Sequence, residues 1–360
     1  MNFINTIRQS HNPMKRALLV GINYVGTPNQ LYGCINDIDN VAEYLRSSRG
    51  YAPNSIIVMS DATPRKPTRA NILNGFKELL QGVRSGDELW FHYSGHGSLQ
   101  RDTNGDEESG TDSCICPLDF NRAGLITDDT VRSELVALVP SGVRLYAVLD
   151  MCHSGTGCDL RYKYDDSSYL VDSAGPFPSK YDPNAWALRQ TTYEHKRYEK
   201  TAGNVYCISG CQDSQTSADA FLDGKAAGAL THSLLESLKA NSASTYKWKH
   251  LLKDVCCRER VGRFTQRTSI TSGNSLNLDE LVFFVPPPPP PPPAPPVVAP
   301  TTPAFQLPPW VQAYLQYLQR RRWPVPAWLR EQMSQFQQRR DISQNSANRI
   351  GNGKMKMRLI

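Results

Sequence analysis

The feature that most constrains the fold is an alternation of short apolar runs with helical patterns over the first 150 residues. The apolar runs, typical of buried strands, are 17–22, 55–59, 88–93 and 143–149. The helical patterns between them are 38–45, 68–83 (opened by a threonine cap) and 129–138. Such alternation predicts an α/β fold, in which helices flank both faces of a mostly parallel sheet.

The second half of the chain continues the pattern less regularly. We expect a strand at 205–209, helices at 228–238 and 246–260, and a last strand at 281–285. The stretch 161–202 is polar, rich in tyrosine and without clear periodicity, which indicates an exposed linker between two halves of one domain.

Two predicted strands end in short glycine-containing motifs. Tyr-Ser-Gly-His-Gly covers 93–97, and Asp-Met-Cys-His-Ser-Gly covers 150–155. The carboxyl ends of parallel strands form the functional crevice of an open sheet, so we expect His96 and Cys152 to lie together there. Alone, a His-Gly is usually a turn and a single cysteine is usually an apolar core residue.

A histidine beside a cysteine is the minimal pair for thiol hydrolysis. The thiolate is the attacking species, so Cys152 would be the nucleophile and His96 the general base and later the acid. The backbone N–H groups of Gly97 and Cys152 are our candidates for the oxyanion donors. The pair therefore predicts a cysteine peptidase.

Four stretches together resemble the metacaspase family. They are Ala-Leu-Leu-Val-Gly-Ile (17–22), Leu-Tyr-Gly-Cys-Ile-Asn-Asp (31–37), 93–97 and 150–155. The likeness covers roughly 15–285. It implies a caspase-like fold with a large catalytic half at 1–160, the linker at 161–202 and a small half at 203–285. It also implies a monomeric, calcium-dependent endopeptidase that cleaves after Arg or Lys.

The resemblance implies a first specificity pocket lined by Cys34, Asp37, Ser94 and Asp150. Two carboxylates there would pair with a guanidinium or ammonium group, since a buried charge needs a partner. The alternative is that Asp37 merely begins a helix and Asp150 merely ends a strand.

The resemblance also implies a calcium site at Asp112, Asp128, Asp129 and Asp159. Hard cations bind several oxygen ligands, which four carboxylates from separate loops would supply. The alternative for Asp128 is a role as helix N-cap.

The linker holds four basic residues, namely Arg189, Lys196, Arg197 and Lys200. An enzyme specific for basic residues would find cleavage sites in its own chain there, so we expect self-cleavage within 161–202. The alternative is an uncleaved loop.

After residue 285 the chain changes character. Eight consecutive prolines, from Pro286 to Pro293, open a proline-rich linker at 286–309. It is either a stiff spacer or a ligand for SH3, WW or profilin-type grooves.

The tail at 310–360 is basic and compatible with helix. Residues 301–360 carry a net charge of +8, whereas the whole chain carries +6. No nucleic-acid motif accompanies this charge, so specific nucleic-acid binding is not expected.

The cysteines and the hydropathy indicate a cytoplasmic protein without a membrane span. Nine cysteines without framework spacing indicate reduced thiols and a cytoplasmic setting. No apolar run is long enough to span a membrane.

The alternative to the peptidase function is a catalytically weak caspase-like scaffold, which binds partners through its proline-rich and basic tail.

Overall fold

The computed structural model describes residues 13–105, 110–152, 154, 157–166, 190–211, 220–222, 225–264, 267–283, 307–320 and 324–335. The chain divides into two compact units, Met1–Val285 and Pro286–Ile360. Each unit is described by itself.

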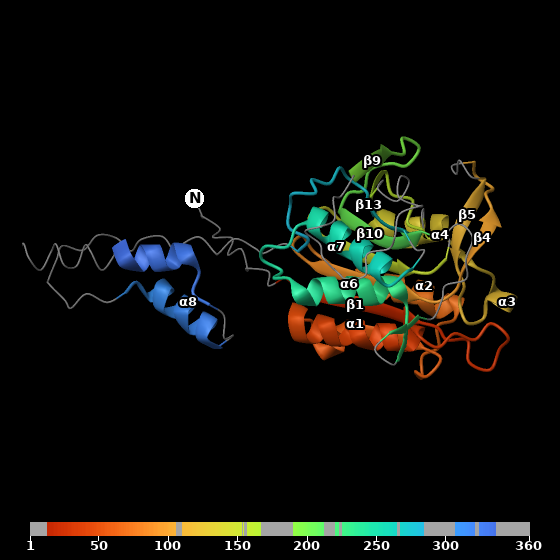
Figure 1. Cartoon of the computed structure of the whole chain (residues 1–360), viewed down its shortest axis with the longest axis horizontal. Coiled ribbons are helices and arrows are strands. Elements are labelled where there is room, and N and C mark those ends of the chain that lie inside the picture. Colours follow the sequence, from red (N-terminus) through yellow and green to blue (C-terminus); the bar gives the residue numbers. More distant parts are fainter. Residues whose placement is uncertain are drawn as a thin grey trace, which may run out of the picture. The chain divides into compact units, whose positions relative to one another are not determined.

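An eight-stranded sheet forms the centre of the first unit (Figure 1). In spatial order its strands are β2 (Ile56–Ser60), β1 (Lys15–Gly21), β3 (Glu88–Ser94), β7 (Arg144–Asp150), β10 (Asn204–Cys211), β13 (Arg267–Ser272), β8 (Tyr162–Asp166) and β9 (Gln190–Glu194). The five from β2 to β10 pair in parallel, and the last three join antiparallel. The prediction of a mostly parallel sheet is confirmed.

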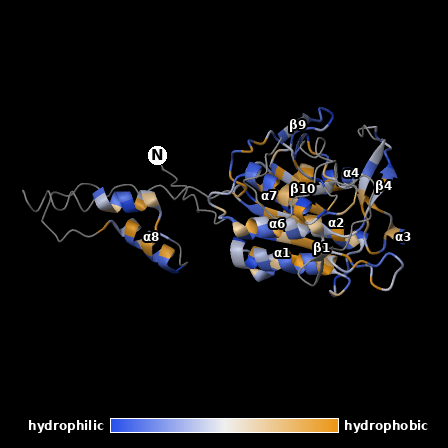
Figure 2. Cartoon of the chain, in the orientation of Figure 1, coloured by the Kyte–Doolittle hydropathy of each residue, from blue (hydrophilic) through white to orange (hydrophobic). Residues whose placement is uncertain are grey.

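Helices cover both faces of this sheet, because successive residues of a buried strand point to opposite sides. Leu18 and Val20 of β1 pack with α2 (Arg69–Leu80) and α4 (Asp128–Glu134). Ala17 and Leu19 pack with α1 (Cys34–Arg49), α6 (Ala229–Ala240) and α7 (Trp248–Val261). Figure 2 shows apolar residues concentrated in the central strands and hydrophilic residues along the outer sides of the helices.

Short elements complete the unit. They are the helical turns η1 (Pro53–Ser55), α3 (Phe120–Ala123) and η2 (Val136–Leu138), a sheet of β4 (Gly97–Arg101), β5 (Thr111–Ile115) and β6 (Ile126–Thr127), and a hairpin of β11 (Ala220–Leu222) and β12 (Lys225–Ala227). Within the described ranges, no helix combines the length and apolarity needed to cross a membrane.

The predicted helices and strands of the first 150 residues are all present. The threonine cap is also confirmed, because the Thr68 side chain accepts a hydrogen bond from the Asn71 N–H. The helix predicted at 129–138 is split, since α4 ends at Glu134 and a 3-10 turn follows.

The last predicted strand, at 281–285, is wrong. Leu281 forms only an isolated bridge to Lys247, and residues 284 and 285 lie outside the described ranges. The strand is instead β13, which reads Arg-Thr-Ser-Ile-Thr-Ser and has one apolar residue. Its hydroxyls are buried but hydrogen-bonded, as in Thr268 Oγ1 to Glu259 Oε1 at 2.6 Å. A polar strand stabilised in this way lacks the hydrophobic pattern by which strands are predicted.

The predicted linker also contains regular structure. Both its ends are strands, β8 and β9, which pair with each other at the sheet edge. Residues 167–189 lie outside the described ranges.

In the second unit, α8 (Pro309–Arg320) and a helical segment at 327–335 pack around Val311, Leu318 and Leu329. These two segments agree with the expectation that the tail is compatible with helix. The proline run from Pro286 to Pro293 lies outside the described residues.

Candidate active site

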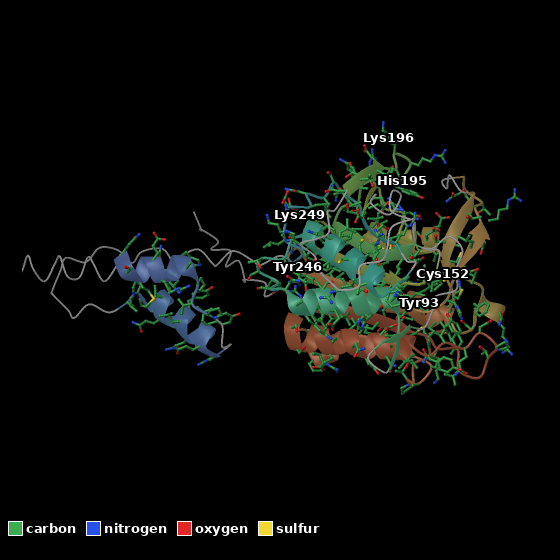
Figure 3. The ribbon with its side chains drawn as sticks, in the orientation of Figure 1. Tyr93, Cys152, His195, Lys196, Tyr246 and Lys249 are labelled. Carbon is green, nitrogen blue, oxygen red and sulfur yellow. The ribbon has the colours of Figure 1, made fainter. Side chains whose placement is uncertain are left out.

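The loops that carry His96 and Cys152 leave neighbouring parallel strands at the same level. Ser94, the last residue of β3, pairs with Asp150, the last of β7. The Gly95 N–H donates to the Asp150 carbonyl at 3.3 Å. Figure 3 shows Cys152 and Tyr93 at one end of the unit, with Tyr246 and Lys249 toward the other. The two sequence motifs therefore meet at the carboxyl edge of the sheet.

Gly97 brings the two loops into direct contact. A Cβ atom built at Gly97 would overlap the backbone carbonyl of Cys152. Only glycine allows this approach, and it places the residue after His96 against the backbone of the cysteine.

One ring nitrogen of His96 has a defined partner. Its Nε2 lies 2.8 Å from the carbonyl oxygen of Asn29. A carbonyl only accepts hydrogen bonds, so Nε2 carries the proton and Nδ1 is the unprotonated nitrogen of the neutral ring. This tautomer suits a base that receives a proton at Nδ1.

Two buried tyrosines, Tyr24 and Tyr93, hold the backbone of His96. Tyr24 lies outside the sequence motifs, which gave no sign of its role. The Tyr24 hydroxyl accepts from the His96 N–H at 3.2 Å and donates to the Cys116 carbonyl at 2.6 Å. The Tyr93 hydroxyl donates to the His96 carbonyl at 2.8 Å and lies 3.0 Å from the Tyr24 hydroxyl. The rings of Tyr24 and His96 lie 4.8 Å apart. Burial raises the pKa of both tyrosines well above its usual value, so both stay neutral.

Cys152 has a second thiol nearby. Burial, and after it the neighbouring Cys152, raise the pKa of Cys116 to about 11. Cys116 is therefore a thiol at neutral pH and a poor nucleophile. Cys152 itself is 9% exposed.

Two of the four predicted pocket residues lie against one glycine, and a third is hydrogen-bonded to one of them. The Ser94 hydroxyl donates to Asp37 Oδ2 at 2.6 Å. A Cβ at Gly228 would crowd the carboxylates of both Asp37 and Asp150. Cys34 begins α1, one helical turn before Asp37. Asp37 does lie in the first turn of a helix and Asp150 does end a strand, but those positions alone do not explain why both buried carboxylates face Gly228.

The start of α6 supplies donors to both carboxylates. The Gly228 N–H donates to Asp37 Oδ1 at 2.9 Å. The Thr231 N–H and hydroxyl donate to Asp150 Oδ2 at 2.8 Å and 2.6 Å. These amides are among those that a helix leaves without intrahelical partners, so the Asp37 and Asp150 carboxylates cap the helix. Sequence patterns did not indicate Gly228 or Thr231, because their partners are distant in the chain.

The predicted calcium residues divide into three that are buried and one that is not. Asp112, Asp128 and Asp159 are nearly inaccessible. The Ser113 N–H donates to Asp128 Oδ2 at 2.8 Å, while Asp129 accepts from Asn104 Nδ2 at 2.8 Å. The N-cap of α4 is Thr127, whose side chain accepts from the Thr130 N–H. The N-cap alternative for Asp128 is therefore wrong.

The charges of this acidic cluster affect two thiols. Burial, then Asp128 and Asp112, raise the pKa of Cys114 to about 12. Asp159 and Asp128 also contribute to the raised pKa of Cys158, after the hydrogen bond with Cys207 and burial. Buried carboxylate oxygens are the donors that calcium prefers. However, no three acidic, histidine or cysteine side chains in the described ranges are gathered as a ready metal site. The donor chemistry of these carboxylates fits the ion.

A mixed, mostly parallel sheet with helices on both faces, and with the His96 and Cys152 loops at its carboxyl edge, defines an α/β protein consistent with the caspase-like fold. Residues 15–161 match the family profile described as metacaspase, peptidase C14 domain. The chain is 35% identical to Metacaspase-1 of Yarrowia lipolytica over 74% of its length and 63% of the relative's. It is 34% identical to Metacaspase-1 of Ajellomyces capsulatus over 74% and 82%, respectively.

This chain belongs to the metacaspase family. Metacaspase-1 of Scheffersomyces stipitis is 40% identical over 64% of both chains, so the chain spans less than two thirds of several curated relatives. A crystal structure of a Geobacter sulfurreducens protein matches with a TM-score of 0.49 at 22% identity, and covers 74% of this chain and 95% of that one.

Proposed function

We propose that the protein is a calcium-dependent cysteine endopeptidase that cleaves peptide bonds after Arg or Lys. The observation that carries this proposal is the meeting of the His96 and Cys152 loops at the ends of β3 and β7, beside two buried carboxylates. Family membership supports the same reaction class.

The His–Cys pair accounts for the chemical steps. His96 Nδ1 takes the proton of the Cys152 thiol, and the thiolate attacks the scissile carbonyl carbon. The resulting oxyanion receives hydrogen bonds from the N–H groups of Gly97 and Cys152. His96 then gives its proton to the leaving amine, and water hydrolyses the thioester that remains.

The pocket of Cys34, Asp37, Ser94 and Asp150 accounts for the preference for basic residues. Its two carboxylates are buried, and a substrate cation would pair with them. An acidic side chain before the scissile bond would be repelled.

Calcium would be held by Asp112, Asp128, Asp129 and Asp159. The bound ion would supply positive charge that offsets the repulsion among these carboxylates. Because β4 begins at Gly97 and pairs with the strand that carries Asp112, ordering this cluster would also order the loop after His96.

Self-cleavage in 161–202 is part of the proposal. Lys196, Arg197 and Lys200 are exposed in the turn after β9, where a protease could reach them. Arg189 lies outside the described residues.

One assay tests the proposal. Purified protein is given fluorogenic peptides that end in Arg, Lys or Asp, with calcium or with a chelator, and the chain's own new termini are mapped. We expect cleavage of the Arg and Lys peptides only with calcium, new termini within 161–202, and no activity in Cys152→Ala. Activity that persists in Cys152→Ala, or a preference for Asp, contradicts the mechanism. A folded wild-type protein without activity favours the scaffold.

A further inference from the structure

The inference concerns Thr231 on α6, and it rests on the proposed function because it concerns how the basic-specific pocket is built. Thr231 is 1% exposed and makes two hydrogen bonds to a single oxygen, Asp150 Oδ2. Two donors on one carboxylate oxygen fix the rotation of the carboxylate plane about its Cβ–Cγ bond. α6 lies beside α1, which carries the other pocket carboxylate (Figure 1).

Behind Thr231 lies a buried histidine that no proposed step uses. His92 is fully buried in β3, and its Nε2 lies 3.2 Å from Thr231 Oγ1. The Thr231 hydroxyl already donates its proton to Asp150, so its oxygen accepts from the His92 Nε2–H. The result is a directed chain from His92 through Thr231 to Asp150.

The state of His92 supports this direction. Burial lowers the pKa of His92 to about 3, so the ring is neutral at physiological pH. Its Nδ1 has no hydrogen-bond partner in the described part of the chain, so the ring is held through Nε2 by Thr231. A neutral donor at this place orients the hydroxyl and adds no charge to the acidic pocket.

We propose that Thr231 is a positioning residue that orients the Asp150 carboxylate for a guanidinium, with His92 holding its hydroxyl in the donating direction, so that the pair sets the preference for Arg over Lys. A guanidinium is a planar fork, and its pairing with carboxylates depends on their orientation. An ammonium is a point charge and is less sensitive to that orientation. Loss of the Thr231 hydroxyl should therefore harm Arg substrates more than Lys substrates.

The test compares five full-length single variants and one double variant on matched Arg and Lys peptides. Thr231→Val removes the hydroxyl at nearly constant volume, and Thr231→Ser retains it. Ser233→Ala is the matched control, since Ser233 is a buried hydroxyl on the same helix without a hydrogen-bond partner among the described residues. His92→Leu removes the donor behind Thr231, and His92→Gln is a second, milder change should His92→Leu fail to fold.

Thr231→Val should lower kcat/KM for the Arg peptide by about tenfold or more, mainly through KM, as expected for a lost hydrogen bond to a charged group. For the Lys peptide, kcat/KM should fall only about threefold, so the ratio of the two kcat/KM values, Arg over Lys, falls. Thr231→Ser and Ser233→Ala should keep the wild-type ratio. His92→Leu combined with Thr231→Val should show little further loss, because the two act through one chain.

A purely structural role would lower kcat/KM equally for both peptides. An unchanged ratio of kcat/KM for the Arg peptide to that for the Lys peptide in Thr231→Val therefore overturns the proposal. So does additive loss in the double variant. Binding of the two peptides to Cys152→Ala protein, measured by calorimetry, separates this inference from the proposed reaction. If Cys152→Ala protein binds the Arg peptide more tightly in a way that depends on Thr231, while the protein with Cys152 intact cleaves neither peptide, only the proposed reaction is contradicted. Absence of binding to either peptide overturns the pocket and this inference together.

Discussion

At the residue scale, His96 is held by three residues from two segments. Tyr24 and Tyr93 contact its backbone, and the Asn29 carbonyl accepts from its ring. Gly95 lies so close to both tyrosine hydroxyls that a Cβ there would collide with the Tyr93 oxygen. The position and tautomer of the proposed base therefore depend on residues that take no part in proton transfer.

Tyr24→Phe tests this dependence, because it removes the hydroxyl and retains the ring beside His96. We expect kcat for an Arg peptide to fall by roughly tenfold with little change in KM, since a lost hydrogen bond to a buried backbone group costs about 1–3 kcal/mol. The rate of Cys152 alkylation by iodoacetamide should fall in parallel. Tyr44→Phe, which alters a buried tyrosine in α1, is the control. Wild-type kcat together with a lowered melting temperature would show that Tyr24 only stabilises the fold.

At the element scale, α6 links the two halves of the chain at the pocket. Gly228 donates to Asp37 from 191 residues away, and Thr231 donates to Asp150 from 81 residues away. The helix begins without a capping side chain of its own, since the pocket carboxylates accept from its first amides. Helix stability and pocket geometry are thus coupled.

Gly228→Ala should break this coupling. The backbone of Gly228 has φ −70°, which alanine adopts readily, so any effect comes from crowding. The new Cβ would lie 2.8 Å from Asp37 Oδ2 and even closer to Asp150. We expect a loss of about 1–3 kcal/mol in the free energy of unfolding and a large rise in KM for Arg peptides.

The control for Gly228→Ala is Gly75→Ala in α2, on the opposite face of the sheet. The three atoms nearest to its Cβ would be side-chain atoms of Leu18 and Met59 at 2.9–3.0 Å. It should change stability, as measured by urea denaturation, and leave KM unaltered. Equal KM values for Gly228→Ala and wild type would mean that α6 is not part of the pocket.

At the scale of the whole molecule, stability should depend on a buried acid that belongs to neither sequence motif. Glu259 of α7 is fully buried and bonded to Thr268 of β13. Burial raises the pKa of Glu259 to about 8, and the negative charge of Asp150 adds to this, while the Thr268 hydrogen bonds oppose it. The folded protein therefore holds a proton that the unfolded chain releases above its ordinary pKa of 4.5.

The sign follows from this difference in bound protons. Between about pH 4.5 and pH 8, the contribution of Glu259 to the free energy of unfolding decreases as pH rises, by up to about 1.4 kcal/mol per pH unit. Glu259→Gln should remove this contribution, so the variant loses less stability than the wild type between pH 5 and pH 8. Urea denaturation at several pH values measures both slopes. Parallel slopes would show that Glu259 is already ionised in the folded protein.

The sequence by itself determined the positions of the parallel strands along the chain, the helices between them and the strand ends that carry His96 and Cys152. These features follow from local periodicity, because a buried strand or an amphipathic helix needs its pattern within a few residues. The family was also correctly inferred from four short stretches. The resemblance alone predicted that Asp37 and Ser94 belong to one pocket, and their side chains are hydrogen-bonded to each other.

Only the tertiary structure decided which groups complete the site. Tyr24, Asn29, His92 and Thr231 act through long-range hydrogen bonds, and nothing in their local sequence records a partner that lies tens of residues away. The polar strand β13 was missed for the same reason, since the buried hydroxyls of Thr268 and Ser269 have partners on α7 and β10. Local pattern reports where apolar surface must be buried, but the partner of each buried polar group is fixed only when the chain is folded.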